Sequence, residues 1–242
     1  MNIDKTAIIT GAGRGIGRSI AIGFAESGIR VCCVARTKSE VEETESFIKS
    51  AGGQAIAVSA DVTNYDSVID FFETTNKRFR GIDIVVIAAG ISIDQRSVET
   101  SNPKEWRQVI ETNLIGAYHT AKAAIPYFKQ RGAGKIIILG SGLGHRGIPE
   151  RSAYSSSKSG LWMLTRVLAQ ELHAYNISVN ELIPGPVLTK MAPERENEIK
   201  TKLSKSEWLK KPEDVVPMAL FLAKQPDHGP TAQSYSLMRR DC

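Results

Sequence analysis

A tyrosine and a lysine four residues apart are the first candidates for chemistry in this sequence. Tyr154 and Lys158 lie in a stretch with helical spacing of apolar residues, so both side chains share one face of the expected helix. At roughly 4 Å and an effective dielectric constant near 20, an ammonium attracts a phenolate by about 4 kcal/mol before desolvation is subtracted. We therefore expect Lys158 to lower the pKa of Tyr154 from about 10 toward neutrality, which suits a proton donor.

A glycine-rich segment, Thr10–Gly17, follows the first apolar run of the chain, Ala7–Ile9. Glycines permit a tight turn and a close approach of phosphate to the backbone, and a helix after them offers free N–H groups and the positive end of its dipole. The spacing is not G-x-G-x-x-G, because Ile16 takes the sixth place, and it is not a P-loop, because arginine replaces the lysine. The segment predicts a phosphate-binding turn.

Short apolar runs alternate with longer amphipathic stretches along the chain. The runs are Ala7–Ile9, Val31–Ala35, Ala55–Val58, Ile82–Ala89, Ile136–Leu139 and Ile177–Ile183. Continuous apolar runs are typical of parallel strands that are covered on both faces. We predict an α/β fold with one domain over residues 1–242, a doubly wound Rossmann sheet of about seven parallel strands with helices on both faces. Such sheets bind ligands at the carboxyl ends of their strands.

Three further segments have a predicted structure that bears on the site. Pro103–Arg131 has the pattern of one long helix, which Pro126 should kink or interrupt in its hydrogen bonding. A second helix is expected over about Ala153–Tyr175. Gln233–Leu237 predicts a last strand.

Composition excludes several classes of protein. The chain has 242 residues, 42% hydrophobic and 24% charged, which excludes a disordered protein. Cys32 and Cys33 are neighbours in an apolar run and Cys242 is the last residue, an arrangement that excludes a disulfide scaffold and suits a reducing cytoplasm. No apolar stretch approaches the roughly 20 residues that cross a membrane, and residues 1–5 carry no signal-peptide core, so no membrane association is expected.

The positive charge admits two interpretations. A net charge of +5 and a pI near 9.1 occur in nucleic-acid-binding proteins and in proteins that bind anionic small molecules. The lysines and arginines are scattered, and the densest stretch, Lys200–Lys211, is interrupted by Glu207 and Trp208. We interpret this stretch as solvated and expect no nucleic-acid partner. Arg239–Arg240 has no assigned role.

The motifs together resemble the short-chain dehydrogenase/reductase family over about residues 5–191. Thr10–Gly17 matches its T-G-x-x-x-G-I-G turn, and Tyr154–Lys158 matches its Y-x-x-x-K motif, with Ser141 at the family's separation. The resemblance implies hydride transfer between a nicotinamide cofactor and a carbonyl carbon. Tyr154 would be the proton donor, Lys158 would also hydrogen-bond the nicotinamide ribose, and Ser141 would donate a hydrogen bond to the substrate oxygen.

A fourth catalytic residue and a group of histidines complete the candidates. Asn113 matches the family residue that holds a water for reprotonation of the lysine, although an asparagine at a helix kink would fit the same pattern. The histidines show no metal-ligand spacing, so no metal site is expected. We interpret them as structural or surface residues, and only His145, which follows Ser141 closely, could reach a substrate.

The end of the second apolar run predicts the choice of cofactor. NAD enzymes usually place an acid there to bind the ribose 2′-OH, but no acid occurs between Glu26 and Glu40. Arg36 and Lys38 occupy this place instead, and a guanidinium can bind the 2′-phosphate of NADP. Arg14 matches a family arginine in the glycine turn that often assists. The cofactor is therefore expected to be NADP(H).

The resemblance implies further cofactor contacts after the other strands. The family's Asn-Asn-Ala-Gly segment is reduced here to Ala89–Gly90 preceded by Ile87–Ala88, which removes polar groups that brace the strand end. The expected contacts are Gly11, Arg14, Gly15, Ile16, Gly17, Arg36, Asp61, Val62, Ala89, Gly90, Tyr154, Lys158, Pro184, Gly185, Val187 and Thr189.

The overall pattern looks closest to 3-oxoacyl-acyl-carrier-protein reductases. This implies NADPH-dependent reduction of a small-molecule or carrier-bound carbonyl to a secondary alcohol, by a homotetramer, the commonest state in the family. A sugar, polyol or other secondary-alcohol dehydrogenase is the enzyme alternative, and a non-catalytic NADP-binding sensor is another. The family's substrate-covering segment corresponds to about residues 190–211.

Overall fold

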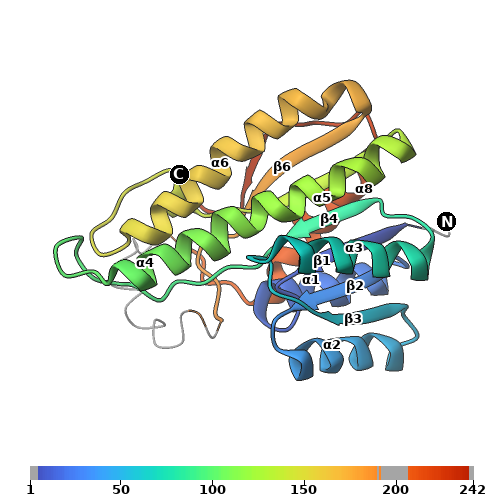
Figure 1. Ribbon diagram of the computed structural model, residues 1–242, viewed down its shortest axis with the longest axis horizontal. Coiled ribbons are helices and arrows are strands. Elements are labelled where there is room, and N and C mark those ends of the chain that lie inside the picture. Colours follow the sequence, from blue (N-terminus) through green and yellow to red (C-terminus); the bar gives the residue numbers. More distant parts are fainter. Residues whose placement is uncertain (1–4, 190, 192–206, 240–242) are drawn as a thin grey trace.

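The computed structural model describes residues 5–189, 191 and 207–239 and places seven parallel strands in one sheet, in the order β3-β2-β1-β4-β5-β6-β7 (Figure 1). The strands are β1 Thr6–Thr10, β2 Arg30–Ala35, β3 Ala55–Ser59, β4 Ile84–Ile87, β5 Gly134–Leu139, β6 Ile177–Ile183 and β7 Ser234–Ser236. The predicted doubly wound parallel sheet is confirmed. The first and last strands of the chain, β1 and β7, differ from their predicted ranges, Ala7–Ile9 and Gln233–Leu237, only at their ends.

Helices cover both faces of this sheet (Figure 1). The α-helices are α1 Gly15–Glu26, α2 Lys38–Ser50, α3 Tyr65–Phe79, α4 Pro103–Ile110, α5 Gly116–Arg131, α6 Ser152–Leu172 and α8 Val216–Lys224. One apolar core packs α1, α2 and α8 against the sheet, and a second core packs α3, α5 and α6 against the opposite face. Ile8 and Ile9 are neighbours on β1 and are fully buried in different cores, which explains why the strand sequences are continuously apolar.

The segment predicted as one long helix is helical throughout but changes type in its middle. Between α4 and α5 the backbone forms a π-helical turn, Glu111–Ile115, which contains Asn113. The helix α5 continues through Pro126 to Arg131. The change of helix type therefore lies well before the proline, which itself can donate no helical hydrogen bond, and π-helical turns of this kind are frequent at functional sites.

The sheet topology gathers the candidate residues at one end of the molecule. The strand order reverses between β1 and β4, so the connections after these two strands diverge and leave a crevice, the usual ligand position in open α/β sheets. The glycine turn follows β1, Ser141 follows β5, and Tyr154 lies at the start of α6. Short 3-10 segments η2 Gly142–Gly144, η3 His173–Tyr175 and η4 Pro212–Val215 connect the elements.

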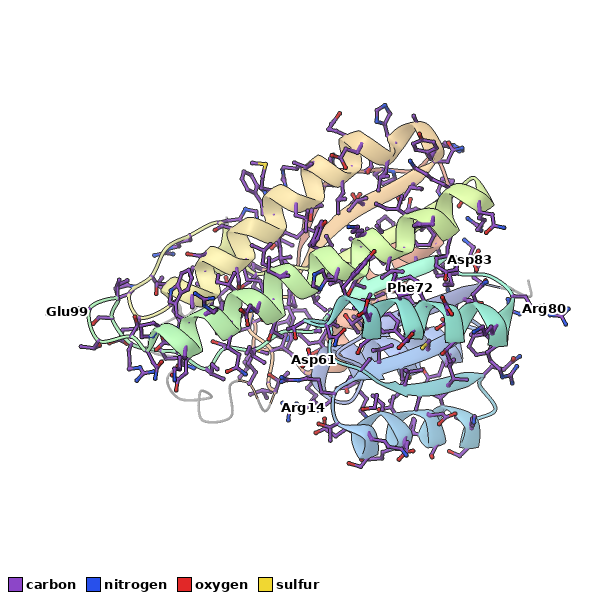
Figure 2. The ribbon with its side chains drawn as sticks, viewed as in Figure 1. Arg14, Asp61, Phe72, Arg80, Asp83 and Glu99 are labelled. Carbon is purple, nitrogen blue, oxygen red and sulfur yellow. The ribbon has the colours of Figure 1, made fainter. Side chains whose placement is uncertain are left out.

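The contribution of the second core to stability can be tested at the packed aromatic residues of α3. Phe72 is fully buried, with its ring centroid 5.1 Å from that of Phe71 and 5.7 Å from that of Tyr127 on α5 (Figure 2). We expect Phe72→Ala to lower the free energy of unfolding by about 3–5 kcal/mol through lost burial and a residual cavity. Phe47→Ala on α2 is the control, because that ring is 48% exposed. Urea unfolding measures both, and equal effects would contradict this core assignment.

Candidate active site

The glycine turn is packed so closely that side chains would fill it. Gly11 has φ +70°, and a Cβ there would lie 2.9 Å from the backbone of Ala88 and Ala89 at the end of β4. A Cβ on Gly17 would lie 2.3 Å from the carbonyl oxygen of Gly11. The helix α1 begins at Gly15, so its free N–H groups face this turn. The closely packed turn and the free N–H groups fit a dinucleotide diphosphate.

The end of β4 is braced although its two family asparagines are absent. The Thr10 hydroxyl accepts hydrogen bonds from the backbone N–H groups of Ala88 at 3.1 Å and Ala89 at 3.2 Å. Thr10 thus holds the segment that carries Ala89–Gly90 beside the glycine turn. The bracing that the sequence left in doubt comes from β1.

Asn113 provides the second brace from the π-helical turn. Its side-chain Oδ1 accepts from the backbone N–H of Ile91 at 2.8 Å, and its Nδ2 donates to the Ile91 carbonyl and to the Ser157 hydroxyl, both at 3.0 Å. The residue is fully buried. Its side chain therefore links the segment after β4 to α6, the helix that carries Tyr154 and Lys158.

Ser141, Tyr154 and Lys158 come together where β5 ends and α6 begins. Ser141 directly precedes η2, and its hydroxyl accepts a hydrogen bond from the Leu143 N–H at 3.2 Å. Lys158 Nζ lies 5.6 Å from the centroid of the Tyr154 ring and donates to the Leu139 carbonyl at 2.7 Å. Three groups that were separated in the sequence thus share one site, as the motif spacing predicted.

The electrostatics of this site differ from the sequence expectation. Burial raises the pKa of Tyr154 above its usual value, and a hydrogen bond with Ser141 lowers it in part. Lys158 directs its ammonium to a backbone carbonyl rather than to the phenol oxygen, and Lys158 does not lower the pKa of Tyr154 as expected. Burial lowers the pKa of Lys158 to about 8, against an opposing influence of the Glu181 carboxylate.

The predicted phosphate-binding cations lie on the surface near the glycine turn. Arg14 precedes α1 and forms an exposed ion pair with Glu40, with Nη1 and Oε1 3.5 Å apart. Arg36 follows the last residue of β2 and is exposed, and Lys38 pairs with Glu42 at 3.7 Å. Figure 2 shows Arg14 and Asp61 at one end of the sheet, with Arg80 and Asp83 at the other.

The pair Asp61–Val62 forms the turn between β3 and α3. Asp61 Oδ1 accepts from both the N–H and the hydroxyl of Thr63 at 2.9 Å. Val62 is buried, and its carbonyl is 3.1 Å from His119 Nδ1. These contacts fix the backbone of the turn at the carboxyl end of β3.

The segment after β6 returns to the glycine turn. A Cβ on Gly15 would lie 3.3 Å from the Thr189 methyl group, so Thr189 flanks the cradle. Pro184 and Val187 are buried, and Gly185 has φ +67°. Ile16 packs against the core beneath α1. Of the expected substrate-covering segment, residue 190 and residues 192–206 lie outside the described residues, as does Arg240.

Sequence reasoning missed a buried charge on β6 and a buried lysine. Glu181 is fully buried, and its Oε2 is 3.1 Å from Nε2 of His145, so this histidine is directed at a carboxylate. Lys210 is also fully buried, and its Nζ donates to the Trp208 carbonyl at 3.1 Å. An acidic residue inside the apolar run Ile177–Ile183 was the available signal for Glu181.

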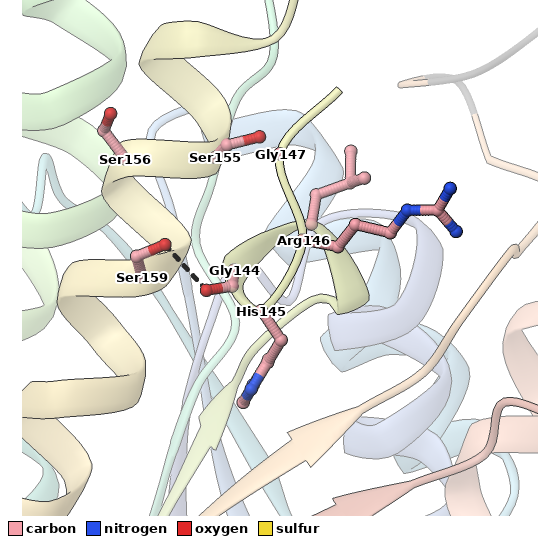
Figure 3. A pocket seen from close by; sticks show the side chains of 8 residues that line it. Gly144, His145, Arg146, Gly147, Ser155, Ser156 and Ser159 are labelled. Atoms are coloured by element: carbon pink, nitrogen blue, oxygen red, sulfur yellow. Dashed lines mark hydrogen bonds between the residues drawn. The ribbon is translucent and has the colours of Figure 1, made fainter. Parts of the chain in front are cut away.

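A cavity of about 480 Å³ adjoins the loop after Ser141 (Figure 3). Its lining combines this loop with the first turns of α6: Leu143, Gly144, His145, Arg146, Gly147, Ser155, Ser156 and Ser159. Ser159 donates to the Gly144 carbonyl at 2.6 Å and so closes the loop onto the helix.

Residues 5–200 match the short chain dehydrogenase family. A short-chain type dehydrogenase/reductase from Picea abies is 35% identical over 241 residues, 95% of this chain and 89% of that protein. The 3-oxoacyl-[acyl-carrier-protein] reductase FabG of Staphylococcus aureus (strain N315) is 34% identical over 204 residues, 84% of this chain and 82% of its own. The crystal structure of a 3-oxoacyl-[acyl-carrier protein] reductase from Brucella melitensis, 30% identical, has a TM-score of 0.90 and covers 98% of this chain and 90% of its own.

The chain therefore belongs to the short-chain dehydrogenase/reductase family and is an oxidoreductase. Members of this family use nicotinamide cofactors, and the glycine cradle described above fits the diphosphate of either NAD or NADP. Within residues 5–189, 191 and 207–239, no helix is long and apolar enough to cross a membrane. The same residues contain no group of three or more His, Cys, Asp or Glu side chains placed to hold a metal ion.

The brace between β1 and β4 can be tested with two threonines on one strand. Thr10→Val keeps the shape but leaves two backbone N–H groups without their acceptor, so we expect a loss of about 1–3 kcal/mol in the free energy of unfolding. Thr6→Val is the matched control, because Thr6 is equally buried and its hydroxyl has no hydrogen-bond partner. Urea unfolding should show Thr6→Val neutral or stabilising; equal losses would contradict the brace.

Proposed function

We propose that this chain is an NADPH-dependent reductase that converts a carbonyl to a secondary alcohol, with Tyr154 as the proton donor. The observation that supports it best is the convergence of Ser141, Tyr154 and Lys158 beside the glycine cradle. These groups, of which Lys158 is buried and Ser141 and Tyr154 are half-buried, supply a hydrogen-bond donor, an acid and a cation within one site, the set that carbonyl reduction requires. A non-catalytic sensor would have no need of all three.

The roles of the residues follow from the charge that develops on the substrate oxygen. The bound cofactor supplies the hydride that reduces the carbonyl carbon. Ser141 donates a hydrogen bond to the carbonyl oxygen as negative charge grows there, and Tyr154 transfers its proton to that oxygen. The resulting phenolate is stabilised by the Lys158 ammonium, which in the proposed working state turns from the Leu139 carbonyl toward the phenolate and the nicotinamide ribose. Asn113 ties the segment after β4 to α6, which carries Tyr154 and Lys158. In the proposal it also holds a water that returns the proton to Lys158.

The cofactor site is proposed to extend from the glycine cradle to the ends of the neighbouring strands. Gly11, Gly15, Ile16 and Gly17 would surround the diphosphate, with Thr189 beside it. Asp61–Val62 would contact the adenine, and Ala89–Gly90 with Pro184, Gly185 and Val187 would lie against the ribose and nicotinamide. Arg36, assisted by Arg14, would bind the 2′-phosphate, because no acidic residue occupies the end of β2.

The substrate is proposed to be a 3-oxoacyl group carried on an acidic carrier protein. Two relatives named as 3-oxoacyl-acyl-carrier-protein reductases support this choice, and the net charge of +5 suits an acidic partner. We further propose that the enzyme acts in the cytoplasm as a homotetramer without a nucleic-acid partner. Buried Cys32 and Cys33, which are free thiols, are compatible with a reducing compartment.

Tyr154→Phe removes the proton donor and should lower kcat/KM for ketone reduction about 10²–10⁴-fold. NADPH oxidation is followed with acetoacetyl thioesters, sugars and simple ketones, with NADH in parallel and Tyr175→Phe, an exposed tyrosine, as the control. Unchanged NADPH oxidation by Tyr154→Phe across the panel would rule out this mechanism, and a preference for sugars would favour a polyol dehydrogenase.

Because reduction needs Tyr154 and Lys158 in their protonated forms, the wild-type rate should fall as pH rises through about 8, the pKa of Lys158.

Arg36→Asp should reverse the cofactor preference. Loss of a charge-assisted hydrogen bond worth about 1.5–3 kcal/mol predicts roughly a 10- to 100-fold lower kcat/KM for NADPH, with NADH affected far less. Arg80→Asp is the matched control, because it makes the same change of charge at the opposite end of the sheet (Figure 2). Equal losses with both cofactors, or an equal effect of Arg80→Asp, would show that Arg36 does not bind a 2′-phosphate.

A further inference from the structure

A carboxylate is buried at the end of β5, where the proposed catalytic lysine also donates its hydrogen bond. Glu181 belongs to β6, where it follows Ile177 and Val179 on the face that α6 covers, and it is fully buried. The neighbouring strand makes room for it, because a Cβ on Gly140 would lie only 2.0 Å from Glu181 Oε1. A side chain at residue 140 would therefore displace the glutamate from this position.

The carboxylate is held by donors from two different elements. Its Oε2 lies 3.1 Å from His145 Nε2 in the loop after Ser141, and the Ser234 hydroxyl of β7 donates to the same oxygen at 2.5 Å. Arg166 on α6 donates to Ser234 at 3.3 Å and stacks over the Trp162 ring, against whose edge the His145 ring also packs. In Figure 3 the His145 side chain turns away from the serines of α6 and toward the strands. These contacts fix the position of the Glu181 carboxylate.

Glu181 and the ammonium of Lys158 contact consecutive residues at the end of β5. Glu181 Oε1 lies over Gly140, and Lys158 Nζ donates to the carbonyl of the preceding residue, Leu139. The loop that carries His145 packs on the same part of α6, since a Cβ on Gly144 would clash with the Lys158 backbone at 2.8 Å. The titratable and charged side chains around this point come from the loop, α6 and β6: His145, Tyr154, Lys158, Arg166 and Glu181.

We propose that Glu181 is a positioning residue of the active site, whose buried carboxylate stabilises the ammonium form of Lys158. The proposed reductase needs that ammonium to stabilise the Tyr154 phenolate, so the proposal rests on the proposed function for its catalytic consequence. The burial that lowers the pKa of Lys158 is opposed by this carboxylate, in agreement with the geometry. Without Glu181, the lysine would lose its proton at a lower pH, and the reductase would lose activity there too.

The direct test reads the charge of Lys158 without any reaction. Lysine side chains labelled with 13C at Cε are titrated by NMR in the intact cofactor-free chain, and the Lys158 signal is assigned by its loss in Lys158→Arg. A wild-type midpoint near 8 is expected, and Glu181→Gln should lower it by roughly 1 pH unit. Ser234→Ala keeps the carboxylate and should move the midpoint less. An unchanged midpoint in Glu181→Gln would overturn the proposal.

The catalytic consequence is read from the pH profile of kcat/KM for reduction. In Glu181→Gln the alkaline limb should move to lower pH by the same amount as the NMR midpoint, whereas a merely structural defect would lower the rate equally at every pH. Glu181→Ala gives the same two readouts if the glutamine variant does not fold, because it adds no atoms to the site. A shifted midpoint in a chain whose wild type reduces no ketone would support the action on Lys158 and overturn the proposed function.

Discussion

Burial of the Lys158 ammonium is the constraint on which the rest of the site depends. A charge taken out of water must find replacement partners, and the protein supplies a hydrogen bond to the Leu139 carbonyl at 2.7 Å and the favourable charge of the Glu181 carboxylate. The two groups belong to the neighbouring strands β5 and β6. The position of the lysine is therefore tied to the sheet, and Tyr154, one turn earlier on α6, takes its position from the same helix.

On the cofactor side of the site, close contacts between backbone segments hold the binding residues in position. The glycine turn touches the end of β4 at Gly11, and Thr10 and Asn113 fasten the residues that follow β4 to β1 and to α6. The cofactor cradle and the catalytic helix are thus connected through the segment Ala88–Ile91. A shift of this segment would displace both, which explains why hydrogen bonds from two directions hold it.

The sequence predicted what depends on local pattern and missed what depends on packing. Strands buried on both faces leave continuous apolar runs, and motif spacing placed Ser141, Tyr154 and Lys158 together correctly. The π-helical turn could not be foreseen, because it accompanies hydrogen bonds of Asn113 to residues 22 and 44 positions away. The pKa of Tyr154 was predicted in the wrong direction, because burial of the phenol and the orientation of the lysine are properties of the folded chain.

Arg14 and Arg36, the two surface arginines proposed to bind NADP, differ in the contacts that they make in the folded chain. Arg14 already has a carboxylate partner in Glu40, but the pair is 3.5 Å apart with the arginine 61% exposed, and such pairs contribute little stability. A phosphate could therefore replace Glu40 at small cost. Arg36 follows β2 directly, and its backbone carbonyl is tied to the Ser59 hydroxyl at 2.9 Å, so the strand end fixes where its side chain starts. Under the proposed use of NADP, selectivity depends chiefly on Arg36, while Arg14 adds charge that Glu40 partly offsets.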